Sequence, residues 1–281
     1  MKGRAIVTGA DGGMGRCIST ALAKAGYEVI MICFDAGKAK QCRDEIAKET
    51  ANEKIIIKEA DLSDMSQVES VANEILEEAL PIDLLMNNAG TLSTHFRQTA
   101  DGLEQTVAVN YMAPYLLTRK LLPLMHSGSR IVAMVSCTYA IGKISPSFFT
   151  NGKEGAFWRI PIYSNTKLAL WLFIRKLSEM VADKGILVNA ADPGIVSTRI
   201  ISMDMWFDPL TDIFFRPFIR TPQQGAATAI HLLLGQITGT GGMYASCKRR
   251  NLSEQYLNHP QMESLWHDTE EYFRKNCQIT F

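Results

Sequence analysis

Residues 8–15 read T-G-A-D-G-G-M-G. They follow the apolar run R-A-I-V-T-G at 4–9 and lead into C-I-S-T-A-L-A-K-A at 17–25, a stretch typical of a helix. Glycine lets the backbone turn sharply and pass close to other groups. A strand that turns through glycines directly into a helix begins a strand–helix–strand unit. The stretch therefore predicts an α/β fold and marks the end of its first strand.

The same alternation of strand and helix continues along the first two-thirds of the chain. Short apolar runs, each followed by a stretch with helical spacing, stand at 4–9, 28–33, 54–59, 82–87, 130–135 and 186–190. This order predicts right-handed crossovers and a parallel sheet with helices on both faces. With a last strand around Tyr244, we predict a single doubly wound Rossmann domain with a sheet of about seven strands.

The composition is that of a globular protein with a large core. Of 281 residues, 47% are hydrophobic and 21% are charged, and Lys plus Arg equals Asp plus Glu at 29 each. Because neither charge forms a block, no nucleic-acid face or polybasic membrane patch is expected. The expected partners are small molecules or other copies of the chain.

Targeting and metal-binding signals are weak. The apolar run after Arg4 is too short for a signal peptide or a membrane span, so we expect a cytoplasmic protein without a membrane span. The six cysteines have no C-x-x-C spacing, which favours incidental thiols and no metal site.

The glycine stretch also suggests a ligand. Backbone N–H groups at a helix N-terminus, reached through glycines, can hold a pyrophosphate. The alternative is a glycine-rich turn without a ligand, but the position between a first strand and a first helix favours the phosphate site.

Further motifs follow in order: D-L at 61–62, N-N-A-G at 87–90, Asn110, Ser136, Y-S-N-T-K from Tyr163 to Lys167, and P-G-x-V-x-T at 193–198. With T-G-x-x-x-G-x-G from Thr8, this set resembles the short-chain dehydrogenases/reductases from residue 4 to about 245. The resemblance implies a nicotinamide dinucleotide bound by Thr8, Gly9, Gly13, Met14, Gly15, Phe34, Lys38, Asp61, Leu62, Asn88, Ala89, Gly90, Tyr163, Lys167, Pro193, Gly194, Val196 and Thr198.

Tyrosine and lysine stand four residues apart three times, from Tyr139, Tyr163 and Tyr244. On a helix such a pair shares a face, whereas on a strand the two are about 13 Å apart. Tyr244 lies in a predicted strand, and Gly142 makes a stable helical turn after Tyr139 doubtful. Only Tyr163 precedes a long apolar helix, so geometry favours the pair Tyr163 and Lys167.

The resemblance implies four catalytic residues, Asn110, Ser136, Tyr163 and Lys167. Tyr163 would be the general acid/base in hydride transfer, with its pKa lowered by the Lys167 charge and an oxidised nicotinamide. Ser136 would hold the substrate oxygen. Asn110 would kink its helix and keep a water beside the lysine.

The cofactor's phosphate form depends on the end of the second predicted strand. Cys33 replaces the acid that would bind a ribose 2'-OH, and Phe34 stands where NADP-linked relatives often carry Arg. Lys38 and Arg16 could supply a cation, so we expect NADP(H) rather than NAD(H), although Asp35 argues against it. Asp11 departs from the uncharged residue usual in the glycine loop, and its carboxylate would be costly beside a pyrophosphate unless it turned away to cap backbone N–H groups.

Ser136 and Tyr163 lie 27 residues apart, and this wide interval resembles the retinol-dehydrogenase-like branch, which has a long insertion there. We expect 1–250 to form the catalytic domain, with the aromatic segment 195–221 as a lid, and 251–281 to form a helical tail whose helix spans 254–275. The substrate would be an apolar alcohol or carbonyl compound. The aromatic residues could equally pack a lid or a dimer interface, and a homodimer or homotetramer is expected. A cofactor-binding regulator without activity and a sugar epimerase or dehydratase are the alternative functions.

Overall fold

The computed structural model describes residues 2–150, 157–196 and 220–281. Its centre is one sheet with the strand order β3-β2-β1-β4-β5-β6-β7-β8. The strands are β1 (Arg4–Thr8), β2 (Glu28–Cys33), β3 (Ile55–Glu59), β4 (Ile82–Asn87), β5 (Met125–Met134), β6 (Leu187–Asp192), β7 (Met243–Ala245) and β8 (Lys248–Arg249). The first seven are parallel, as predicted, and the two-residue β8 adds an antiparallel edge.

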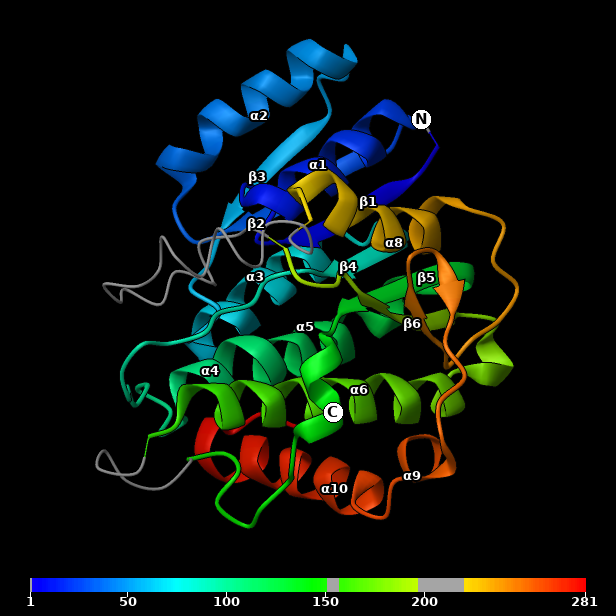
Figure 1. Ribbon diagram of the computed structural model, residues 1–281. Helices are drawn as coiled ribbons and strands as arrows, with labels where there is room; N and C mark the ends of the chain where they lie inside the picture. Colours follow the sequence, from blue (N-terminus) through cyan, green and yellow to red (C-terminus); the bar gives the residue numbers. More distant parts are fainter. Residues whose placement is uncertain (1, 151–156, 197–219) are drawn as a thin grey trace, which may run out of the picture.

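Helices cover both faces of the sheet (Figure 1). The helical segments are α1 (Gly13–Lys24), α2 (Ala36–Thr50), α3 (Met65–Glu77), α4 (Gln105–Val107), η1 (Ala108–Met112), α5 (Ala113–Leu121), η2 (Leu122–Leu124), η3 (Cys137–Ile141), α6 (Arg159–Met180), η5 (Ala182–Lys184), α8 (Pro222–Leu234), α9 (Glu254–Leu257), α10 (Met262–Tyr272) and η7 (Phe273–Cys277). Side chains alternate along β1, so Ile6 packs with α3, α5 and α6, and Val7 packs with α1, α2 and α8. The predicted doubly wound domain is confirmed.

The strand order reverses beside β1. From β1 the chain builds outward to β3 and then returns to form β4 on the other side of β1. In open α/β sheets, ligands bind beyond the carboxyl ends of the strands at such a reversal. The fold therefore makes the segments that follow β1 and β4 the expected place for a ligand.

Two predicted boundaries needed correction. The insertion expected between Ser136 and Tyr163 ends earlier, because α6 begins at Arg159, and Pro161 is tolerated within the first turn of a helix. The tail at 254–275 is not one helix: α9 ends at Leu257, and α10 begins at Met262, just beyond Pro260. Proline lacks the N–H that a continuous helix would require.

The tail packs against η1, α5 and α6. The Tyr111 hydroxyl is 2.7 Å from the Thr269 hydroxyl, and the Trp171 indole donates to the carbonyl of Tyr256 at 2.9 Å. The rings of Tyr115 and Phe273 stack with their centroids 5.9 Å apart. Because α6 is covered by the sheet on one side and the tail on the other, its middle is apolar nearly all round.

Most of the predicted lid lies outside the described residues. Of 195–221, the structure describes Ile195, Val196, Arg220 and Thr221, so the roles proposed for the aromatic residues stay predictions. Among the described helices, none is both long enough and apolar enough to cross a bilayer.

Candidate active site

The ends of β1 and β4 are joined by side-chain hydrogen bonds. The Thr8 hydroxyl accepts the backbone N–H groups of Asn88 and Ala89, each at 3.0 Å. The Asn88 amide donates to the Thr8 carbonyl at 3.0 Å. Three residues predicted to bind the cofactor therefore hold the ends of β1 and β4 together.

The glycine loop fits a pyrophosphate. Gly9 has φ +57°, and Gly12 caps α1 without a side-chain hydrogen bond. The first turn of α1 holds no acid, while Gly12 and Gly13 are exposed. The first N–H groups of α1 therefore face solvent at the positive end of the helix dipole, as a diphosphate requires.

Gly15 is required for packing rather than for its backbone angle. A Cβ there would lie 1.9 Å from the Gly9 carbonyl oxygen, whereas one at Gly12 would meet only that oxygen, at 3.5 Å. We expect Gly15→Ala to lower the free energy of unfolding by about 2 kcal/mol or more and to weaken dinucleotide binding. Urea denaturation and a fluorescence titration measure the two effects.

Gly12→Ala is the matched control, since it adds the same methyl group one turn away. Its stability should stay within about 1 kcal/mol of the parent, because φ is −74° and the space is open. Equal loss in both variants would contradict a specific packing role for Gly15.

Residues predicted for the adenosine end lie beyond β2 and β3. Phe34 is 70% exposed, an unusual state for a large apolar side chain. The Lys38 ammonium lies 3.0 Å from Asp35. Asp61 accepts hydrogen bonds from the backbone N–H and the hydroxyl of Ser63 at 2.8 and 2.7 Å, and Leu62 is partly buried beside it.

Asn110 lies in a π-helical turn, η1, between α4 and α5. Its amide oxygen accepts the backbone N–H of Thr91 at 2.7 Å. Its amide nitrogen donates to the carbonyl of Thr91 and to the hydroxyl of Thr166, at 2.9 and 3.2 Å. The π-helical turn directs the buried amide of Asn110 toward Thr91 and Thr166, so Asn110 links the segment after the N-N-A-G loop to α6.

Lys167 is buried at the centre of the site. Its side chain is on the face of α6 that meets the sheet, is 3% exposed, and donates to the Met134 carbonyl at 2.9 Å. Gly90 passes so close that a Cβ there would lie 3.5 Å from the Lys167 Nζ. Burial lowers the pKa of Lys167 to about 8.

Tyr163 lies one turn before Lys167 on α6, and the lysine Nζ is 5.4 Å from the centre of its ring. Burial raises the pKa of Tyr163 to about 12, while a hydrogen bond with the Ser136 side chain acts in the opposite direction. The lowering expected from Lys167 together with an oxidised nicotinamide stays a prediction. The Lys167 ammonium lies over the Tyr163 ring and donates to the Met134 carbonyl. Burial strengthens the attraction between this ammonium and a phenolate, but it also destabilises the phenolate itself, and the second effect is larger.

The segment after β6 is held by a residue that the sequence patterns did not indicate. Arg220 donates to the Pro193 carbonyl at 3.1 Å, and its backbone N–H donates to the Ile195 carbonyl at 2.7 Å. Gly194 has φ +73° and Val196 is buried. Thr198 lies outside the described residues. A single arginine before a helix belongs to no sequence motif, so the contacts of Arg220 are found only in the structure.

The other two tyrosine–lysine pairs are not arranged as the pair on α6. Tyr139 does lie in a helical turn, contrary to expectation, but this short 3₁₀ turn, η3, ends at Ile141 before Lys143. Tyr244 is buried on β7, whereas Lys248 is exposed on β8. Of the three pairs, Tyr163 and Lys167 alone share one continuous helix.

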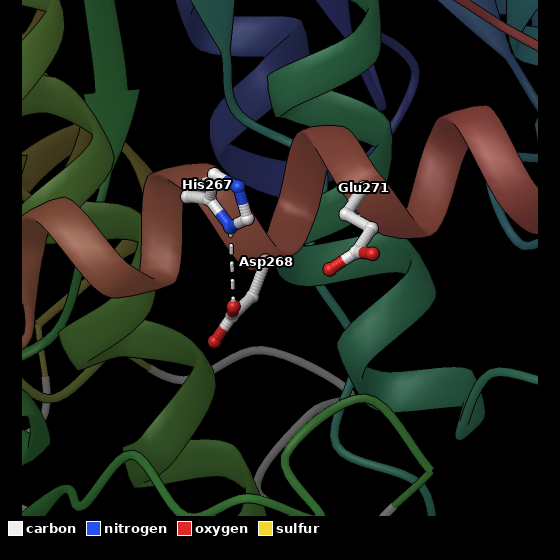
Figure 2. Close-up of side chains that lie close together, drawn as sticks. All are labelled: His267, Asp268 and Glu271. Carbon is white, nitrogen blue, oxygen red and sulfur yellow. Dashed lines mark ion pairs between the residues drawn. The ribbon is translucent and has the colours of Figure 1, made fainter.

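One cluster of metal-binding residue types occurs in the described ranges, on α10 (Figure 2). Its members are His267, Asp268 and Glu271, and the His267 Nδ1 lies 3.6 Å from Asp268. Glu271 already contacts Lys275 at 2.5 Å. Because the cluster is largely exposed and its charges are paired, it does not indicate a metal centre.

A family model described as short chain dehydrogenase matches residues 4–204. Mouse retinol dehydrogenase 14 is 31% identical over 278 residues, covering 93% of this chain and 83% of the relative. Human retinol dehydrogenase 12 is 31% identical over 265 residues with the same coverage. Human polyprenol dehydrogenase is 30% identical over 288 residues, covering 98% of this chain and 84% of the relative.

Solved structures show the same fold. An uncharacterized protein from Mycobacterium paratuberculosis has a TM-score of 0.78 at 23% identity, over 96% of this chain and 93% of the other. A short chain dehydrogenase from Burkholderia cenocepacia, solved in complex with NADP, has a TM-score of 0.70 at 22% identity, over 87% and 96%. At these identities the likeness extends to the fold alone.

Proposed function

Since this chain belongs to the short-chain dehydrogenase family, in its retinol-dehydrogenase-like branch, we propose that it exchanges a hydride between a nicotinamide cofactor and an apolar alcohol or carbonyl substrate. The observation that carries the proposal is the meeting of Ser136, Tyr163 and Lys167 at the carboxyl ends of the central strands, the same edge of the sheet at which the glycine loop lies. The nicotinamide, when bound, supplies or accepts the hydride.

Tyr163 moves the proton. With a pKa raised to about 12, its phenol is protonated at neutral pH, so it is ready to donate to a carbonyl oxygen as that oxygen gains negative charge. Ser136 lies within hydrogen-bonding reach of the phenol, so its hydroxyl can hold the same substrate oxygen. For oxidation the two residues act in reverse, with the phenolate as base.

Lys167 and Asn110 support this transfer. Because the Lys167 pKa is about 8, the amine can gain or lose a proton near neutral pH at little free-energy cost. Asn110 spends its hydrogen bonds on Thr91 and Thr166, so we assign it a positioning role between the loop and the lysine's helix.

Support for an apolar substrate comes from the surface beside these residues. Ile141, five residues after Ser136, is 65% exposed, and Trp158, five residues before Tyr163, is 72% exposed. Retinol and polyprenol, in the names of the relatives, are long apolar alcohols. We propose that the exposed side chains at the ends of η3 and α6 bind such an apolar chain.

The test is oxidation of NADH or NADPH, followed at 340 nm, with retinal as the apolar aldehyde and a short polar aldehyde as control. We expect turnover with both dinucleotide and retinal present and at least about 10-fold lower kcat/KM for the polar aldehyde. Preference for the polar aldehyde would overturn the substrate class. Dinucleotide binding without turnover on retinal, a ketone or a steroid would favour a regulator without activity.

A further inference from the structure

The segment 137–144, which follows Ser136, lies against α6. The Lys143 N–H donates to the side-chain oxygen of Asn165 at 2.7 Å, and Asn165 belongs to the Y-S-N-T-K stretch of α6. Gly142 passes so close to α6 that a Cβ there would collide with the Ser164 carbonyl oxygen. The helix that carries Y-S-N-T-K therefore fixes one side of this segment.

Two side chains of the tail hold the main chain of the same segment. The Tyr256 hydroxyl on α9 donates to the Ala140 carbonyl at 3.1 Å, and the Gln261 amide, just before α10, donates to the Ile144 carbonyl at 2.8 Å. Ile141, whose side chain is 65% exposed, lies between the two acceptors. The tail therefore holds the backbone on both sides of a side chain that we propose to bind an apolar substrate.

The short helix α9 is itself fixed to α6. The Trp171 indole donates to the Tyr256 carbonyl at 2.9 Å, and the Arg175 guanidinium donates to the Leu257 carbonyl at 3.2 Å. The ring of Tyr256 packs edge-on against that of Tyr139, with their centroids 5.1 Å apart. Because Tyr256 is held through both its main chain and its ring, its hydroxyl loses little further freedom when it meets its acceptor.

We propose that Tyr256 and Gln261 are positioning residues that determine the preference for long apolar substrates, because they fix the main chain on both sides of Ile141. The inference rests on the proposed function, since that function assigns Ile141 to substrate binding. Ser136 stands two residues beyond β5, so the sheet fixes its position without the tail. A small substrate that does not reach Ile141 should therefore be insensitive to the two tail contacts.

The test compares retinal with a short polar aldehyde as substrates of the parent and of the variant Tyr256→Phe/Gln261→Met. The variant loses both hydrogen-bond donors but keeps the aromatic ring and the length of the second side chain. We expect KM for retinal to rise at least about 10-fold, the size of two lost hydrogen bonds. The kcat/KM for the polar aldehyde and the dinucleotide Kd should stay within about twofold.

A double-mutant cycle with Ile141→Ala distinguishes positioning from a general loss of stability. Ile141→Ala alone should lower kcat/KM for retinal about 10-fold, because one aliphatic side chain no longer covers the substrate. In this background the two tail substitutions should lower kcat/KM by less than about threefold more, because the side chain that they position is already absent.

Tyr272→Phe is the matched control, because it removes another tail hydroxyl that donates to a backbone carbonyl, that of Asp101, at 2.7 Å. Its kinetics should match the parent. If circular dichroism shows that the double variant is poorly folded, Tyr256→Phe alone is used, with an expected rise in retinal KM of about threefold.

Three results would overturn the inference and leave the proposed function standing. They are an unchanged retinal KM in the folded tail variant, equal losses with both aldehydes, and full additivity with Ile141→Ala. Failure of the parent to reduce any aldehyde with either dinucleotide would overturn the proposed function and the inference together.

Discussion

Tyr163→Phe should lower kcat at least about 10³-fold while dinucleotide affinity stays within about twofold. The change removes one hydroxyl and keeps the ring over which the Lys167 ammonium lies. Without the phenol, no group on α6 can donate a proton to the substrate oxygen at neutral pH except the lysine, whose Nζ is directed to the Met134 carbonyl. The lower kcat should therefore reflect a slower chemical step and not weaker dinucleotide binding.

Steady-state kinetics with retinal, joined to the fluorescence titration, separate these effects. Tyr139→Phe is the matched control, because Tyr139 lies three residues after Ser136 and its ring packs against Tyr256 at 5.1 Å. It should retain kcat within about threefold, since surface and loop substitutions away from reacting atoms usually have small effects. A Tyr163→Phe enzyme with more than a tenth of the parent kcat would exclude Tyr163 as the general acid/base.

The fold could be predicted from the sequence because each element satisfies a local rule. Apolar runs such as 28–33 and 82–87 coincide with strands because a parallel strand buried on both faces must be apolar throughout. At Gly15 the sequence motif and the structure also agree, because the motif places a glycine where a Cβ would collide with the Gly9 carbonyl oxygen. Hydrophobic periodicity and glycine spacing involve residues that are close in the sequence, so one sequence is enough to detect both.

What the sequence did not reveal depends on distant contacts. The interruption of the tail is set by Pro260 together with the helices against which the tail packs. The π-helical turn at Asn110 is stabilised by partners at Thr91 and Thr166, 19 and 56 residues away. Such contacts change the role of a residue without changing its local pattern.

Lys167→Met should inactivate the protein and stabilise it at the same time. The Met side chain has a similar length and no charge, so it can occupy the same buried space. We expect kcat to fall at least about 10²-fold, because the site loses the cation beside Tyr163. At pH 7 the free energy of unfolding should rise by about 1–2 kcal/mol.

The gain follows from the pKa of the lysine. Its pKa is about 8 in the folded protein against 10.5 as the ordinary value, a difference that corresponds to about 3 kcal/mol of burial cost for the charged form. Losing the 2.9 Å hydrogen bond to the Met134 carbonyl lowers the free energy of unfolding by about 1 kcal/mol or somewhat more. The net effect stays favourable because removing the buried charge outweighs losing one hydrogen bond.

The pH dependence distinguishes this origin from simple repacking. Between pH 8 and 10.5 the unfolded parent binds more protons than the folded parent, so the parent's stability rises with pH in that window. The advantage of Lys167→Met should be full below pH 8 and shrink as the pH approaches 10.5. Urea denaturation of both proteins at pH 7 and pH 10 measures the difference, with the exposed Lys184→Met as control.

A constant difference across that pH range would mean that packing, not charge burial, determines the stability of the variant. Destabilisation at pH 7 would mean that the Met134 hydrogen bond outweighs the burial cost, and Lys167 would then be a structural residue as well. The expected pattern, stability gained where activity is lost, follows from the position of the lysine. A charge that polarises a buried phenol must itself be buried, and the fold carries that cost at every pH below 8.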